Sequence, residues 1–113
     1  MASLDWVREH GELTVHVKED GDAIVIRACG ELDLDSAQTL EEELRRAMSS
    51  EASAVVLDLG SLRFIDSTGL RALLVAAKLS QRNGRRLRML RAPSALHRLL
   101  DITGLERSLP LAD

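Results

Sequence analysis

Hydrophobic and polar residues alternate near the start of the chain. Leu13, Val15 and Val17 are separated by single polar residues, and this period of two predicts a strand with one buried face. The more apolar segment 23–29 predicts a second strand, and the polar turn between the two is short enough for an antiparallel hairpin. Residues 1–12 precede this pattern and are expected to form a loose leader.

Apolar residues then recur at helical spacing in three segments that alternate with short strand-like runs. Helices are expected from Asp35 or Ser36 to about residue 49, from about Ser67 to Gly84, and from Pro93 to Gly104. Strands are expected at 54–59 and 86–91, with a loop at 60–66. Strands that alternate with helices imply a largely parallel sheet. We therefore expect one α/β domain over residues 13–110, with a four- or five-stranded mixed sheet and helices packed mainly on one side.

The composition excludes several classes of function. Trp6 and Phe64 are the only aromatic residues among 113, and the net charge is -3, so neither base stacking nor attraction to nucleic acid or an anionic membrane is expected. Cys29 is the only cysteine and the three histidines lack metal-ligand spacing, so we expect no disulfide, metal or cofactor. No signal peptide or membrane span is apparent, and a cytoplasmic protein is expected. One cluster of arginines is better explained as a solvated strand edge than as a nucleic-acid site. It consists of Arg82, Arg85, Arg86, Arg88 and Arg91.

The segment 64–70, Phe-Ile-Asp-Ser-Thr-Gly-Leu, carries the most information about chemistry. It leads from a buried strand into the second helix, and sites in parallel sheets tend to lie beyond the carboxyl ends of strands. The hydroxyls of Ser67 and Thr68 lie where the free amides of a helix favour a phosphate, although Asp-Ser-Thr is also typical of an ordinary helix cap. The spacing fits neither a nucleotide-binding loop nor a nucleophile elbow. A triad of Ser67, Asp66 and His97 lacks a recognisable oxyanion loop, so no enzymatic activity is expected.

Several segments, in this order, resemble the bacterial anti-sigma factor antagonists of the STAS domain family. The resemblance spans residues 11 to 110 and therefore nearly the whole domain. The segments that carry it are Gly30-Glu31-Leu32-Asp33 with the following Ala37 and Leu40, Val56-Leu57-Asp58-Leu59, Phe64-Ile65-Asp66-Ser67-Thr68-Gly69-Leu70, and Thr103-Gly104-Leu105.

The resemblance implies a mechanism based on partner switching. Such proteins bind an anti-sigma factor, a serine kinase related to histidine-kinase ATPases, and so release a sigma factor for transcription. The kinase inactivates its antagonist by phosphorylating the serine after the motif aspartate, here Ser67 with Thr68 as second choice, and a metal-dependent serine/threonine phosphatase restores it. Phosphate adds about -1.5 to -2 charges, which would face Asp66 and Asp33 at the partner interface.

The resemblance also implies which residues form the partner-binding face. The expected set is Glu31, Asp33, Asp66, Thr68, Gly69, Leu70 and Arg71. Arg71 departs from the family, which often has a small residue after the motif leucine. The alternative function is a non-phosphorylated STAS scaffold subunit of a stress-signalling or lipid-transport assembly.

Overall fold

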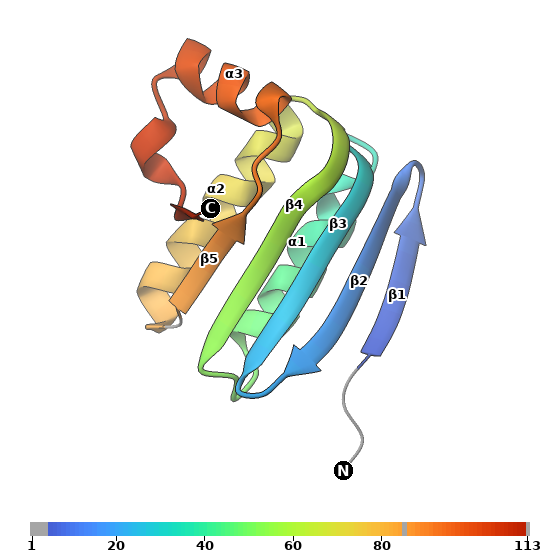
Figure 1. Ribbon diagram of the computed structural model, residues 1–113, viewed down its shortest axis with the longest axis vertical. Helices are drawn as coiled ribbons and strands as arrows, with labels where there is room; N and C mark the ends of the chain where they lie inside the picture. Colours follow the sequence, from blue (N-terminus) through green and yellow to red (C-terminus); the bar gives the residue numbers. More distant parts are fainter. Residues whose placement is uncertain (1–4, 85, 113) are drawn as a thin grey trace.

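The computed structural model describes residues 5–84 and 86–112, which form one six-stranded sheet and three α-helices (Figure 1). The strands are β1 (Asp5–His10), β2 (Leu13–Asp20), β3 (Ala23–Leu32), β4 (Ala54–Ile65), β5 (Arg86–Leu90) and β6 (Leu111–Ala112). The helices are α1 (Ala37–Met48), α2 (Ser67–Asn83) and α3 (Ser94–Thr103), followed by the short 3-10 helix η1 (Glu106–Ser108).

The strands lie in the sheet in the order in which they occur along the chain. β1, β2 and β3 are antiparallel neighbours, whereas β3, β4, β5 and β6 run parallel. Figure 1 shows α1 and α2 together behind the sheet, while no helix of the described residues covers the face nearest the viewer. This confirms the predicted α/β domain with a mixed sheet and helices mainly on one side. The sheet has six strands instead of four or five because β1 and β6 extend its two edges.

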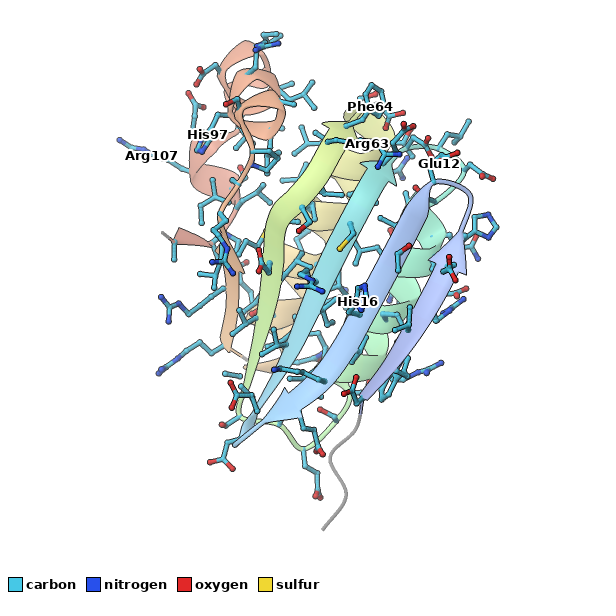
Figure 2. The ribbon with its side chains drawn as sticks, turned by 45° about the vertical axis from the view of Figure 1, so that its right-hand side comes forward. Glu12, His16, Arg63, Phe64, His97 and Arg107 are labelled. Carbon is cyan, nitrogen blue, oxygen red and sulfur yellow. The ribbon has the colours of Figure 1, made fainter. Side chains whose placement is uncertain are left out.

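The alternation in the sequence decides which side chains face the helices. In β2, Leu13, Val15 and Val17 are buried, whereas Thr14 and His16 between them are half-buried on the uncovered face. Figure 2 shows His16 on that face. The core between sheet and helices is largely aliphatic, and its largest fully buried side chains are Leu13, Ile26, Leu32, Leu40, Leu44, Met48, Leu57, Leu59, Leu73, Met89, Leu96 and Leu100.

The first strand lies in a segment that we expected to be a leader. Asp5–His10 pairs along its whole length with β2, from Asp5 opposite Lys18 to His10 opposite Leu13. The strand is also tied to α1, because the side chain of Glu43 accepts hydrogen bonds from Trp6 Nε1 at 3.0 Å and Arg8 Nη1 at 2.8 Å. Because these polar contacts hold β1 in place, its sequence shows no hydrophobic period of two. The sequence pattern therefore did not indicate a strand there. Residues 1–4 of the expected leader lie outside the described residues.

The fourth strand continues through the predicted loop at 60–66 and ends at Ile65. β3 likewise extends to Leu32, and the two strands pair with register shifts between Arg27 and Cys29 and between Gly30 and Glu31. Gly30 has a φ of 104°, and a Cβ there would collide with the carbonyl oxygen of Glu12. The irregular pairing interrupts the period of two, so the sequence pattern ended both strands too early.

One ion pair lies on the uncovered face. Arg91, directly after β5, donates to the carboxylate of Asp58 on β4 through Nη2 at 2.6 Å and Nε at 3.3 Å. Its φ of 56° lies in the left-handed region, which is unfavourable for arginine. One member of the predicted basic cluster is therefore engaged in a structural contact, and Arg85 lies outside the described residues.

Candidate functional site

The N-terminus of α2 combines a helix cap with an unused hydroxyl. Asp66 is the N-cap residue, and its Oδ1 accepts a hydrogen bond from the amide of Gly69 at 2.9 Å. Ser67 is the first residue of α2, and its side chain is exposed. Within the described residues the Ser67 hydroxyl has no hydrogen-bond partner. Asp66 therefore satisfies the helix end, and Ser67 stays available for chemistry.

Gly69 sets how closely α2 approaches the end of β3. A Cβ at Gly69 would lie 2.6 Å from the carbonyl oxygen of Leu32 and 2.9 Å from Ile65 Cγ1. The amide of Asp66 also donates to the Leu32 carbonyl at 3.2 Å. Gly69 and Leu70 were expected on the partner-binding face, but both are buried, with Leu70 only 3% exposed. Both residues therefore lie beneath the surface, and their part in partner binding stays a prediction.

The loop between β3 and α1 is held by its own side chains. Asp33 Oδ1 accepts hydrogen bonds from the amides of Asp35 and Ser36, each at 3.1 Å. The Ser36 hydroxyl donates to the Glu31 carbonyl oxygen at 2.8 Å and accepts from the amide of Asp33 at 3.1 Å. Ser36 occupies the N-cap position of α1 as expected, but its side chain stabilises the loop instead of capping the helix.

These elements bring three of the predicted acidic residues together. Glu31, Asp33 and Asp66 line one open depression beyond the ends of β3 and β4. Figure 2 shows Arg63 and Phe64 at the end of β4, with Glu12 nearby. Arg63 Nη2 lies 3.4 Å from a Glu12 carboxylate oxygen and 3.7 Å from one of Glu31.

Thr68 and Arg71 line a second depression, between α1 and α2. Leu34 borders both this depression and the one that contains Glu31, Asp33 and Asp66. Five of the predicted site residues therefore lie on two adjoining surfaces, and Leu34 and Gln38 line both of them.

Two exposed apolar side chains belong to this surface and were not among the predicted contact residues. Leu34 is 79% exposed and Phe64 is 46% exposed, and both line the depression with the acidic residues. Large apolar side chains that remain in water beside a polar rim are typical of protein interfaces. Both lie within or next to the quoted motifs, but their exposure could not be predicted because a strand end and a short loop can face either way.

The remaining candidate groups lie elsewhere. His97 is on α3 and lines a separate depression with Arg91, Ala92, Leu111 and Ala112, and Figure 2 shows it away from Phe64. The described ranges contain no group of three or more His, Cys, Asp or Glu residues arranged to hold a metal ion. None of the helices formed by the described residues has the length and apolar character that a membrane span requires.

Comparisons with known proteins agree with this architecture. An anti-sigma F factor antagonist from Paenibacillus polymyxa is 28% identical over 102 residues, which cover 89% of this chain and 87% of that protein. An anti-sigma-B factor antagonist from Bacillus subtilis is 31% identical over 94 residues, covering 83% and 85% respectively. A crystal structure of an anti-sigma factor antagonist from Mycobacterium paratuberculosis superposes with a TM-score of 0.75 and 26% identity, over 88% of this chain and 84% of that one. A family model described as STAS domain matches residues 14–113, and the chain belongs to the STAS domain family.

Proposed function

We propose that this chain is an anti-sigma factor antagonist that binds an anti-sigma factor serine kinase and is switched off by phosphorylation of Ser67. The general role is supported by the relatives named anti-sigma factor antagonist. The observation that carries the finer proposal is the free, exposed hydroxyl of Ser67 at the start of α2, next to a rim of acidic and exposed apolar side chains. The chain acts in the cytoplasm through protein partners alone, and it has no catalytic activity of its own.

The switch follows from charge. The kinase transfers the γ-phosphoryl group of ATP to Ser67 Oγ, the hydroxyl proton leaves, and ADP is released. The phosphate adds about -1.5 to -2 charges at neutral pH. The helix tolerates this charge because its first amides and its dipole favour an anion. A partner that packs over Asp66, Asp33 and Glu31 does not tolerate it. The phosphate places further negative charge beside these carboxylates, and like charges at an interface cost several kcal/mol. Affinity falls while the fold stays intact, and a serine/threonine phosphatase reverses the change.

The test compares two serines that occupy the same place in a helix. Ser67 and Ser94 are each the first residue of their helix, α2 and α3, and both are exposed. Baits of wild type, Ser67→Asp and Ser94→Asp are used to capture the kinase from the host. Its affinity for each purified variant is then measured by calorimetric titration, and the phosphorylated residue is mapped by mass spectrometry.

We expect Ser67→Asp to weaken kinase binding by at least about tenfold, which corresponds to about 1.4 kcal/mol. Ser94→Asp and Ser67→Ala should bind like wild type, and Ser67→Ala should resist inactivation by kinase and ATP. The phosphate should be found on Ser67. Unchanged binding by Ser67→Asp, together with phosphate on a residue other than Ser67 and Thr68, would refute the mechanism. A captured kinase that never modifies the chain would favour the scaffold alternative.

A further inference from the structure

Arg71 lies one helical turn after Ser67 on α2. Side chains four residues apart on a helix are neighbours, with about 5–6 Å between their Cβ atoms. Arg71 is exposed, and within the described residues its guanidinium makes no ion pair. Another cation near this end of the molecule is engaged, since Arg63 lies between Glu12 and Glu31.

The carboxylates that could neutralise Arg71 come from α1. Glu41 and Glu42 line the depression that contains Arg71, together with the cation Arg45. Glu42 is already held by Arg8 at 3.1 Å and by Gln38 at 3.2 Å. Within the described residues neither glutamate forms an ion pair with Arg71, which follows Ser67 by four residues on α2.

We propose that Arg71 binds the phosphate on Ser67 within the same chain and so stabilises the switched-off form. This inference rests on the proposed function, because it requires that Ser67 be phosphorylated. A guanidinium can donate two parallel N–H bonds to phosphate oxygens, and an anion four residues before a cation is the favourable order on a helix. We call this contact between Arg71 and the phosphate on Ser67 the clamp. The phosphatase must displace Arg71 to reach the phosphorus atom, so the clamp prolongs the inactive state. It also withdraws the Arg71 charge from the surface that the kinase contacts.

The clamp can be measured on the isolated full chain, without the kinase. Phosphoserine is incorporated at position 67 by genetic encoding, and the second pKa of the phosphate is determined by phosphorus NMR over a pH titration. The variants are Arg71→Gln, Arg71→Lys and the matched control Arg45→Gln. The control removes the same charge from the same depression, but Arg45 lies in the last turn of α1. Arg45 is on α1 and not on the helix that carries Ser67, so it does not have the four-residue spacing that Arg71 has.

A phosphate monoester has a second pKa of about 6. We expect the phosphate pKa to be about half a pH unit higher in Arg71→Gln than in wild type, with Arg71→Lys in between and Arg45→Gln close to wild type. The difference should shrink in about 1 M salt, where the screening length is only about 3 Å. Equal pKa values in wild type and Arg71→Gln, or an equal effect of Arg45→Gln, would overturn the clamp. Either result leaves the kinase-binding test of Ser67→Asp unaffected, so the clamp and the proposed function fail separately.

Discussion

Replacing Glu43 by glutamine should loosen the first strand from the rest of the domain. The Glu43 side chain is fully buried, and its two oxygens accept hydrogen bonds from Trp6 Nε1 at 3.0 Å and Arg8 Nη1 at 2.8 Å. Glutamine has nearly the same shape, but it keeps only one acceptor oxygen. The remaining oxygen can still accept the hydrogen bond from Trp6. The NH₂ group that replaces the second oxygen points its N–H bonds at the guanidinium of Arg8, which is itself a donor. The substitution therefore removes one charge-assisted hydrogen bond and leaves the packing unchanged.

The expected cost follows from the surroundings of that bond. A hydrogen bond to a charged group contributes about 1.5–3 kcal/mol to stability. The side chain of Arg8 is 35% exposed and can recover part of its hydration, so the lower end of the range applies. We expect a loss of about 1.5 kcal/mol in the free energy of unfolding, which lowers the Tm by about 6 °C in a domain of this size.

Glu42 supplies a matched control for this substitution. It is adjacent to Glu43 and contacts the same Arg8 Nη1 at 3.1 Å, but its side chain is 46% exposed. Glu42→Gln should destabilise much less, because an ion pair in contact with solvent is weak and screened by salt. Urea and thermal unfolding of wild type and both variants measure the difference, and hydrogen exchange shows whether the amides of β1 and β2 lose protection first. A Glu43→Gln protein no less stable than Glu42→Gln would refute the idea that buried Glu43 anchors β1.

Three further changes test other contacts. Gly69→Ala should destabilise the domain by about 1–2 kcal/mol in urea, because a Cβ 2.6 Å from the Leu32 carbonyl forces α2 outward and outweighs the better helix propensity of alanine; an unchanged midpoint would contradict this. The hydrogen bond from Arg91 holds the pKa of Asp58 below its usual range, so the pair stabilises the fold above about pH 4 and this stabilisation is lost as the pH falls through the lowered pKa. The Tm difference between wild type and Asp58→Asn should therefore be large at pH 7 and shrink toward pH 2, and a pH-independent difference would rule the pair out as its source. Leu34→Ala should leave the Tm unchanged, because Leu34 is 79% exposed, and should weaken kinase binding about tenfold in calorimetric titration; equal affinity would exclude Leu34 as a contact.

The parts of the fold that could be predicted are those in which hydrophobic burial alone shapes the sequence. The hairpin of β2 and β3 and the three helices show clear periods of two and of three to four, and Gly84 and Gly104 end α2 and α3 as expected, with φ of 64° and 72°. β1 and the second half of β4 were missed for different reasons. β1 is fixed by an edge pairing and by the buried carboxylate of Glu43, while β4 loses its period at the register shifts with β3.

The sequence predicted where the residues of the candidate site lie more fully than which of them are exposed. The segment around Asp66 and Ser67 was predicted to begin a helix and does so, and the acidic residues of the β3–α1 loop line the same depression as Asp66. Periodicity carries no information about which motif residues face solvent once the strands have ended. Leu34 lies in a short loop and Phe64 at a strand end, so their exposure became known only from the structure.

The order of the strands has a consequence for how the protein folds during synthesis. Because the sheet follows the chain order from β1 to β6, each strand that leaves the ribosome adds to an edge that the preceding strand has already formed. No strand has to be inserted between two that are already paired, so loop-closure entropy stays low at each step. Every residue that lines the depression with Glu31, Asp33 and Asp66 precedes α3 and β6 in the chain, so neither element contributes a side chain to it. A nascent chain that has emerged as far as the end of α2 therefore already contains the residues of this surface, while β6 still has to pair with the edge of β5.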